Sequence, residues 1–166
     1  MMTHEQASLD AIDVRILEAL QIDAGRSINE IAAEVNLSHN ACWRRIKLLE
    51  EAEVIRGRVA LLNAKRVGCG ITVFVSLTAG EHTDDWLEAF SERVKRMPEV
   101  VEFYRLTCDI DYLIKLQIPD IESYDQVYKD LIRTVKLRDV SAAFSMEELK
   151  HTHALPLRAR RTAKGR

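Results

Sequence analysis

The amino-acid sequence predicts an α+β chain with a helical N-terminal part and a sheet-containing C-terminal part. Residues 9–51 place apolar side chains at helical spacing, and residues 71–146 alternate between strand-like and helix-like periodicity. The second part runs in the order strand, helix, strand, strand, helix, strand, which is the split βαβ arrangement. The predicted fold class is therefore α+β, with an N-terminal winged-type helix-turn-helix domain followed by a ferredoxin-like βαββαβ domain.

The first expected helix begins after Asp10, whose carboxylate can accept hydrogen bonds from the unpaired N–H groups of a helix start. Ala24-Gly25 is expected to end this helix. Its apolar stripe follows the 3.6-residue period of an α-helix and should be buried. The stripe consists of Ile12, Ile16, Leu17 and Leu20.

Two further helices, joined by a tight turn, are expected within residues 27–49. Ser27 and Glu30 form a Ser-x-x-Glu capping box at the start of the first of them. Asn36 stands where the turn requires a left-handed backbone, and Ser38 can cap the next helix. The inward face of that last helix is expected to contain Cys42, Ile46 and Leu49.

The opposite face of the last helix is polar and basic. A basic run alone would suit an ordinary solvated helix, but the caps, the small Ala32 and the turn Asn36 together favour a helix-turn-helix. In that motif the second helix lies in the major groove of double-stranded DNA. Arg44 and Lys47 would contact phosphate, and His39, Asn40 or Arg45 would read base edges. The expected contacts on this helix are Ser38, His39, Asn40, Trp43, Arg44, Arg45 and Lys47.

Residues 56–70 are expected to form a linker with a short strand. Val54-Ile55 and Val59-Ala60-Leu61-Leu62 have strand-like composition on either side of a Gly flanked by two arginines. Such a segment suits a wing that contacts phosphate, and an exposed loop would have the same sequence, so both interpretations stay open. Arg56 and Arg58 complete the candidate DNA contacts.

Charge is segregated along the chain, although the net charge is only −2. Residues 36–66 contain seven Lys or Arg against three Asp or Glu, and residues 67–157 contain ten against sixteen. Residues 158–166 add five basic residues and no acidic one. This distribution is typical of a basic DNA-binding part attached to an acidic body.

The expected compartment is the cytoplasm. The first residues have no apolar run, which predicts no secretory signal, and no stretch approaches the roughly 18 apolar residues of a membrane span. Cys42, Cys69 and Cys108 are odd in number and widely spaced, which indicates reduced thiols. No zinc-ligand spacing or Gly-rich phosphate loop is present. We therefore expect no metal, no cofactor and no catalytic residue.

The second part contains four expected strands, at residues 71–78, 100–106, 111–118 and 140–146. Thr83 and Asp120 precede the two expected helices. Two helices cover only one face of such a sheet, so we expect dimerisation to bury the other. A dimer with two-fold symmetry predicts a palindromic DNA site.

Seven strings of this sequence resemble the leucine-responsive regulatory protein/AsnC (Lrp/AsnC) family, and the resemblance runs in order from Leu9 to Leu157. The strings are Leu9-Asp-x-x-Asp13, Asn36-Leu-Ser38, Cys42-Trp-Arg-Arg-Ile46, Val59-Ala-Leu-Leu-Asn63, Asp109-Ile-Asp-Tyr-Leu113, Pro119-Asp120 and Met146-Glu-Glu-Leu-Lys150.

The resemblance implies a bacterial or archaeal transcription factor that forms homodimers, which assemble into tetramers or octamers. It also implies a small effector, usually an amino acid, bound at the edge of the second domain where dimers meet. The predicted domains are then 1–55 (helix-turn-helix), 56–70 (linker), 71–150 (ferredoxin-like dimerisation and effector domain) and 151–166 (basic tail, disordered at its end).

By the same resemblance, the effector loop comprises Thr107, Cys108, Asp109, Ile110 and Asp111, and its neighbours are Ile121, Ala143 and Phe144. The two aspartates suit the ammonium group of an amino acid, and the loop amides suit its carboxylate. A purely structural role of Asp109 in the turn stays open.

The family loop commonly reads Gly-Asp-x-Asp-Tyr, and Cys108 replaces its glycine. Three interpretations stay open: a narrowed pocket that accepts a small ligand or none, a thiol that senses oxidants or sulfur compounds, and a tolerated substitution. Acidic neighbours disfavour the thiolate and weigh against sensing.

An enzyme is the alternative function, because siroheme decarboxylases share this architecture. That activity would need histidines and arginines around a tetrapyrrole pocket. Outside the DNA-binding part and the residues before it, the histidines are His82, His151 and His153. The basic helix favours the regulator.

Overall fold

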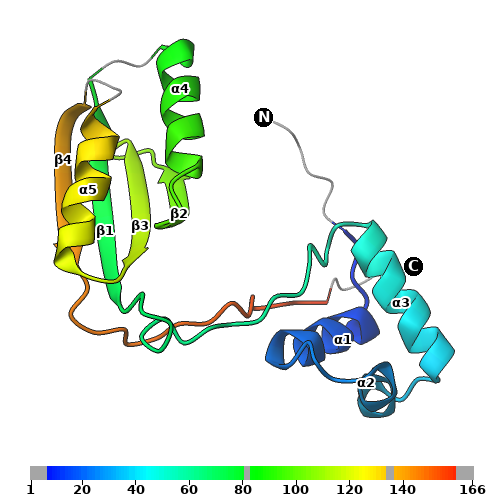
Figure 1. Ribbon diagram of the computed structural model, residues 1–166. Helices are drawn as coiled ribbons and strands as arrows, with labels where there is room; N and C mark the ends of the chain where they lie inside the picture. The colour runs from blue at the N-terminus through cyan, green and yellow to red at the C-terminus, as the bar shows by residue number, and fades with distance from the viewer. Residues whose placement is uncertain (1–6, 81–82, 134–136, 160–166) are drawn as a thin grey trace. The chain divides into compact units, whose positions relative to one another are not determined.

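The computed structural model describes residues 7–80, 83–133 and 137–159. The chain divides into two compact units (Figure 1). The helical unit contains the residues up to 60 together with those from 150 onward, and the sheet unit contains residues 61–149. Each unit has a hydrophobic core of its own. No helix among the described residues is long and apolar enough to cross a membrane.

The helical unit contains α1 (Ala11–Ile22), α2 (Ile28–Val35) and α3 (His39–Glu51). Each helix has the predicted cap: Asp10 and Ser27 form capping boxes with Asp13 and Glu30, and the Ser38 hydroxyl accepts the N–H of Ala41 at 3.3 Å. Asn36 ends α2 in the left-handed conformation, with φ 59° and ψ 48°. The helix-turn-helix geometry is therefore confirmed.

The core of the helical unit lies between these helices. Ile16 and Leu17 are buried as predicted, whereas Ile12 and Leu20 are partly buried and pack against the same cluster. The inward positions of α3 are fully confirmed, and burial raises the pKa of the Cys42 thiol. The buried cluster contains Ile16, Leu17, Ala19, Ile31, Ala32, Val35, Cys42, Ile46 and Leu49.

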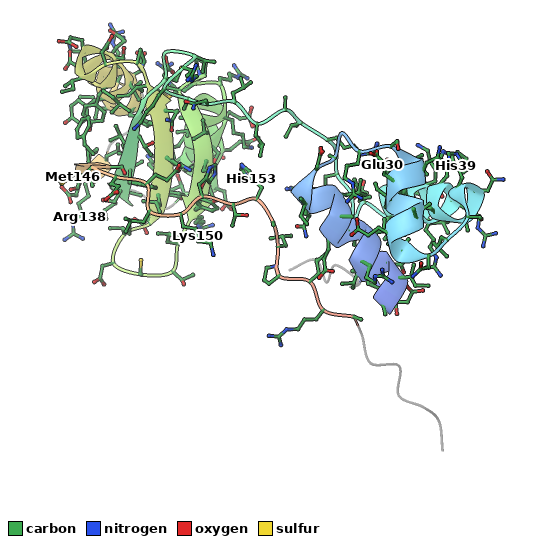
Figure 2. All side chains as sticks on the ribbon, turned by 90° about the horizontal axis from the view of Figure 1, so that it is seen from below. Glu30, His39, Arg138, Met146, Lys150 and His153 are labelled. Atoms are coloured by element: carbon green, nitrogen blue, oxygen red, sulfur yellow. The ribbon has the colours of Figure 1, made fainter. Side chains whose placement is uncertain are left out.

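The C-terminal segment returns to the helical unit. The Leu155 N–H donates to Oε1 of Gln21 at 2.6 Å, and Nε2 of the same amide donates to the Leu155 carbonyl at 3.2 Å. Leu157 packs against the helical core. Met146, Lys150 and His153 mark this extended segment in Figure 2. We predicted disorder at the end of the basic tail 151–166, and its last residues, 160–166, lie outside the described residues.

The predicted linker strand does not form, and that prediction is wrong for the single chain. Residues 56–70 contain no strand, and Val59, Leu61 and Leu62 expose 81%, 70% and 72% of their surface. A strand requires a neighbouring strand for its backbone hydrogen bonds. No described segment of this chain provides such a neighbour, so these apolar residues remain exposed and outside any strand.

The sheet unit has the predicted ferredoxin-like order. Its elements are β1 (Ile71–Ala79), α4 (Asp84–Lys95), β2 (Val100–Arg105), β3 (Tyr112–Ile118), α5 (Ile121–Ile132) and β4 (Leu137–Phe144). The strands form one antiparallel sheet in the order β2-β3-β1-β4. β4 begins and ends earlier than the predicted 140–146. Phe144 already pairs with Val73, near the start of β1, and Met146 is fully exposed beyond the ladder.

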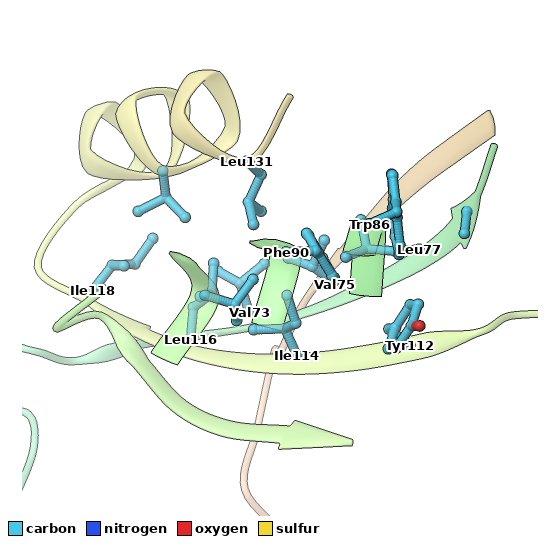
Figure 3. Packing of buried hydrophobic residues seen from close by; sticks show 13 residues of the cluster. Val73, Val75, Leu77, Trp86, Phe90, Tyr112, Ile114, Leu116, Ile118 and Leu131 are labelled. Atoms are coloured by element: carbon cyan, nitrogen blue, oxygen red, sulfur yellow. The ribbon is translucent and has the colours of Figure 1, made fainter. Parts of the chain in front are cut away.

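Both helices of the sheet unit cover one face of the sheet (Figure 1). Alternate residues of β1 and β3, such as Val75 and Ile114, point into this layer and are fully buried. Phe90 of α4 and Leu131 of α5 pack onto them (Figure 3). The opposite face bears polar and apolar side chains, among them Phe74, which is 38% exposed.

Candidate DNA-binding surface and effector loop

The exposed side of α3 presents most of the predicted DNA contacts. Trp43 is 47% exposed, and Arg44 is exposed on the same helix. No ion pair holds Arg44 or Arg56 within the part of the chain that the structure describes. These two side chains therefore carry positive charge that is not neutralised by a neighbouring carboxylate.

His39, the first residue of α3, is oriented by a residue of α2. Its Nδ1 lies 2.7 Å from Oδ1 of Asn29, and an amide oxygen can only accept a hydrogen bond. The ring therefore donates through Nδ1 and keeps Nε2 for another partner. Figure 2 shows His39 on the helical unit. Asn29 is ten positions before His39, and no sequence pattern pointed to it as the support of this ring.

Arg45 has a different environment from the other predicted contacts. Its Nη1 donates to Oδ2 of Asp10 at 2.8 Å and to Oδ1 of Asp13 at 2.6 Å. These bonds raise the pKa of the guanidinium. The pKa of Asp10 is lowered, first by the N–H of Asp13 and then by Arg45. The predicted base reader is thus bound to the start of α1, a contact that the sequence analysis did not anticipate.

Glu50 neutralises two further cations of the predicted surface. Lys47 Nζ donates to one of its oxygens at 2.7 Å, and Arg58 Nη2 donates to the other at 3.0 Å. The hydrogen bond from Lys47 is the main cause of the lowered pKa of Glu50. Because Arg58 belongs to the linker, this ion pair holds the residues after α3 against the helix.

Asp111 fixes the base of the predicted effector loop. Its Oδ2 accepts the N–H of Ala79 at 2.8 Å, and its own N–H donates to the Leu77 carbonyl at 2.9 Å. Its carbonyl accepts the N–H of Leu106 at 2.8 Å. Asp111 therefore joins the hairpin to the end of β1, and one carboxylate oxygen is already used.

The tip of the loop is exposed. Thr107, Cys108 and Asp109 all lie on the surface, and Ile110 is half-buried. The Cys108 thiol lies 3.5 Å from the Ile110 carbonyl. Among the described residues, no ion pair or side-chain hydrogen bond occupies the Asp109 carboxylate. Of the two loop aspartates, Asp109 is the one whose two carboxylate oxygens are both available to a ligand, whereas Asp111 uses one of its two.

The predicted neighbours of the loop lie away from it within one chain, and their part in the site stays a prediction. Tyr112, which follows the loop, pairs with Leu77 near the end of β1, whereas Phe144 pairs with Val73 near its beginning. Four residues of strand correspond to about 13 Å. Ile121, Ala143 and Phe144 thus lie toward the opposite end of the sheet. Strand register, which the sequence analysis did not derive, decides this separation.

Other side chains do not form a second obvious site. Within the described residues, no group of three or more His, Cys, Asp or Glu side chains is arranged to hold a metal ion. A shallow hollow of about 450 Å³ lies beside Arg93, Arg96 and Asp130, and none of the predicted effector residues lines it. The rings of His151 and His153 lie edge to face on the extended C-terminal segment, with their centroids 4.6 Å apart.

Comparison with known proteins agrees with this two-part arrangement. Residues 9–50 match the model of the AsnC-type helix-turn-helix domain, and residues 72–155 match that of the Lrp/AsnC ligand binding domain. A glutamate uptake regulatory protein of Zymomonas mobilis is 55% identical over 149 residues, which are 90% of this chain and 91% of the relative. The DNA-binding transcriptional activator DecR of Escherichia coli K12 is 40% identical, with 90% of this chain and 99% of the relative covered.

Solved structures of transcriptional regulators have the same two-domain fold. An AsnC family transcriptional regulator from Agrobacterium tumefaciens has a TM-score of 0.86 at 48% identity and covers 89% of this chain and 97% of its own. A transcriptional regulator from Neisseria meningitidis in complex with L-Met has a TM-score of 0.85 at 32% identity, with 89% and 96% covered. These relatives are regulators, which supports that function over the alternative enzyme. The chain belongs to the Lrp/AsnC family of transcriptional regulators.

Proposed function

We propose that this regulator binds a palindromic operator as a homodimer, assembles further into tetramers or octamers, and changes its DNA affinity when an amino acid binds. The capped α2–turn–α3 unit carries this proposal, because it presents a basic helix in the chain that also contains a ligand-binding domain. We also infer that it acts in the cytoplasm, where bacterial DNA is found.

The DNA contacts are assigned by exposure and charge. Arg44 and Arg56 would provide unpaired cations for phosphate, and the exposed His39 and Asn40 at the start of α3 would read base edges. When DNA binds, Lys47 and Arg58 would break their ion pairs with Glu50 and form ion pairs with phosphate groups instead. Ser38 supports these residues as the cap of the helix.

The dimer is proposed to cover apolar surface that the single chain leaves open. The uncovered face of the sheet, together with Val59, Leu61 and Leu62, supplies such surface. Dimerisation removes it from water and gives the linker residues a partner for their backbone hydrogen bonds. Sedimentation should therefore show a dimer or a multiple of it, and a stable monomer would contradict this assignment.

The effector is proposed to be an amino acid held by the loop from Thr107 to Asp111. Asp109 would receive the ammonium group, while Asp111 keeps the loop in place through Ala79. Because Ile121, Ala143 and Phe144 lie far from this loop in one chain, they would join the site only from another subunit. The relatives named for glutamate uptake and for an L-Met complex make glutamate and methionine the first ligands to test.

The decisive experiment is fluorescence anisotropy with DNA from upstream of the protein's own gene, compared with a scrambled duplex. Affinity should fall steeply with salt, and one amino acid should shift it. Cys108→Gly provides the matched variant, because it restores the common family residue. A response seen only in Cys108→Gly would mean that the thiol side chain blocks the pocket. Equal affinity for both duplexes would contradict operator binding.

A further inference from the structure

The contact between Arg45 and two aspartates points to a role that differs from DNA contact. A single guanidinium nitrogen lies 2.8 Å from Asp10 Oδ2 and 2.6 Å from Asp13 Oδ1. The Asp13 side chain is only 15% exposed and that of Arg45 30% exposed. We call this three-residue contact between α3 and the start of α1 the Arg45 bridge.

The two carboxylates are themselves fixed by the helix that they begin. Asp10 uses Oδ1 to accept the N–H groups of Ile12 and Asp13, both at 2.8 Å, and keeps Oδ2 for Arg45. Asp13 uses Oδ2 to accept the N–H of Asp10 at 3.1 Å and keeps Oδ1 for Arg45. Each carboxylate therefore divides its oxygens between capping α1 and binding α3, and the bridge has a defined geometry.

The bridge restrains the rotation of α3 about its own axis. Successive residues of an α-helix point about 100° apart, so the direction of Arg45 sets the direction of Arg44 beside it. The inward face of α3 is formed by the apolar side chains of Cys42, Ile46 and Leu49, which provide no directional bond. Charge-assisted hydrogen bonds do provide direction.

We propose that Arg45 is a positioning residue, which orients the recognition helix through Asp10 and Asp13 and does not itself read a base. The proposal rests on DNA binding by this surface and assigns one of its basic residues to a different task. Moving Arg45 to DNA would leave two carboxylates, one of them largely buried, without their cation.

Positioning by Arg45 and direct DNA contact by Arg45 predict different effects of Asp13→Asn on operator binding. If Arg45 acts through the bridge, Asp13→Asn and Arg45→Gln both reduce the preference for operator over scrambled DNA, by about tenfold. The double variant is then no worse than the poorer single variant. If Arg45 contacts a base, Asp13→Asn releases the guanidinium and leaves the preference for operator over scrambled DNA unchanged or raises it, which overturns the proposal.

Salt dependence supplies a second readout. Arg45→Gln should leave the slope of log K against log salt unchanged, while the matched control Arg44→Gln should reduce it by about one. A reduction of about one for Arg45→Gln would also overturn the proposal. Circular dichroism of each full-length variant shows whether the helices persist. If Arg45→Gln does not fold, the less disruptive Arg45→Lys and Asp13→Asn are compared in the same assays.

A charge exchange separates positioning from general destabilisation. Arg45→Glu combined with Asp13→Arg restores an ion pair between the same helices but leaves no arginine at position 45. Recovery of operator preference relative to Arg45→Glu alone supports positioning, and no recovery in a folded variant contradicts it. If the wild-type chain fails to prefer the operator, the proposed operator is wrong, whereas the salt-slope test on any duplex still decides whether Arg45 contacts phosphate.

Discussion

The helical unit and the effector loop use their charged side chains in different ways. In the helical unit, Arg45, Lys47 and Arg58 are all bound to carboxylates of the same unit. In the loop, Asp111 is bound at the base while Asp109 is exposed at the tip. A basic helix is therefore not simply a set of free cations. The charge of Arg45 is used to hold α3 against the start of α1. Lys47 and Arg58 must give up their ion pairs with Glu50 before they can bind phosphate.

The largest expected effect tests whether the two units are stabilised separately. Phe90→Ala removes a ring that is 2% exposed and stacks on Trp86 at 5.0 Å, which should destabilise the sheet unit by about 3–5 kcal/mol. Trp86 fluorescence in a Trp43→Phe background reports on that unit alone. Ile31→Ala is the matched control in the helical core and should leave the Trp86 transition unchanged. Equal shifts in both variants would show that the units unfold together.

The second prediction separates the base of the loop from its tip. Asp111→Ala leaves the Ala79 N–H without its partner and should cost about 1–3 kcal/mol, with loss of any effector response. Asp109→Ala should lose the response without loss of stability. Both variants should keep their basal DNA affinity. Thermal unfolding and anisotropy measure the two properties, and a stable, responsive Asp111→Ala would contradict the structural role.

The third prediction concerns the charge that is neutralised before DNA binds. Glu50→Gln frees Lys47 and Arg58, so DNA affinity should rise about threefold to tenfold at low salt, with a steeper salt dependence. Glu51→Gln, on the same helix but without an ion pair to these cations, is the matched control. Similar affinities of the two variants would mean that Glu50 does not compete with phosphate.

The smallest effect is a loss of stability in acid. The hydrogen bonds to Asp10 lower its pKa below the ordinary 3.8, so the folded state favours the carboxylate. The ionised Asp10 therefore stabilises the folded state at pH values above the pKa that Asp10 has in the unfolded chain. This stabilisation is lost from about pH 4 downward, as the pH falls through the lower pKa of the folded state. Asp10→Asn should therefore show a weaker decline in melting temperature below pH 4 than the wild type. An identical decline would remove Asp10 from the acid response.

Local features were predictable from sequence because the interacting residues are close in the chain. The caps at Asp10, Ser27 and Ser38 and the left-handed Asn36 depend on partners within a few positions. The βαββαβ order followed from periodicity in the same way. The family resemblance added the effector loop, whose ligand contacts remain predictions.

Long-range contacts were not predictable from spacing. Arg45 was expected near the boundary of the outer face with a side chain that reaches outward, yet its partners lie more than 30 positions earlier in the chain. The separation of Phe144 from the loop depends on the register of β4 on β1. The apolar residues 59–62 have the composition of a strand, but composition does not supply the hydrogen-bonding neighbour that a strand needs.

The return of the C-terminal segment makes the sheet unit an insertion within the helical unit. Gln21 and the helical core bind Leu155 and Leu157, so residues 61–149 form a long loop closed at both ends by one small domain. Residues 1–60 alone would lack Leu157, which packs against their core. An isolated DNA-binding fragment should therefore join residues 1–60 to residues 150–159 by a short peptide linker. Since the entropy of loop closure grows only logarithmically with length, this helical unit is suited to accept an inserted domain of another size.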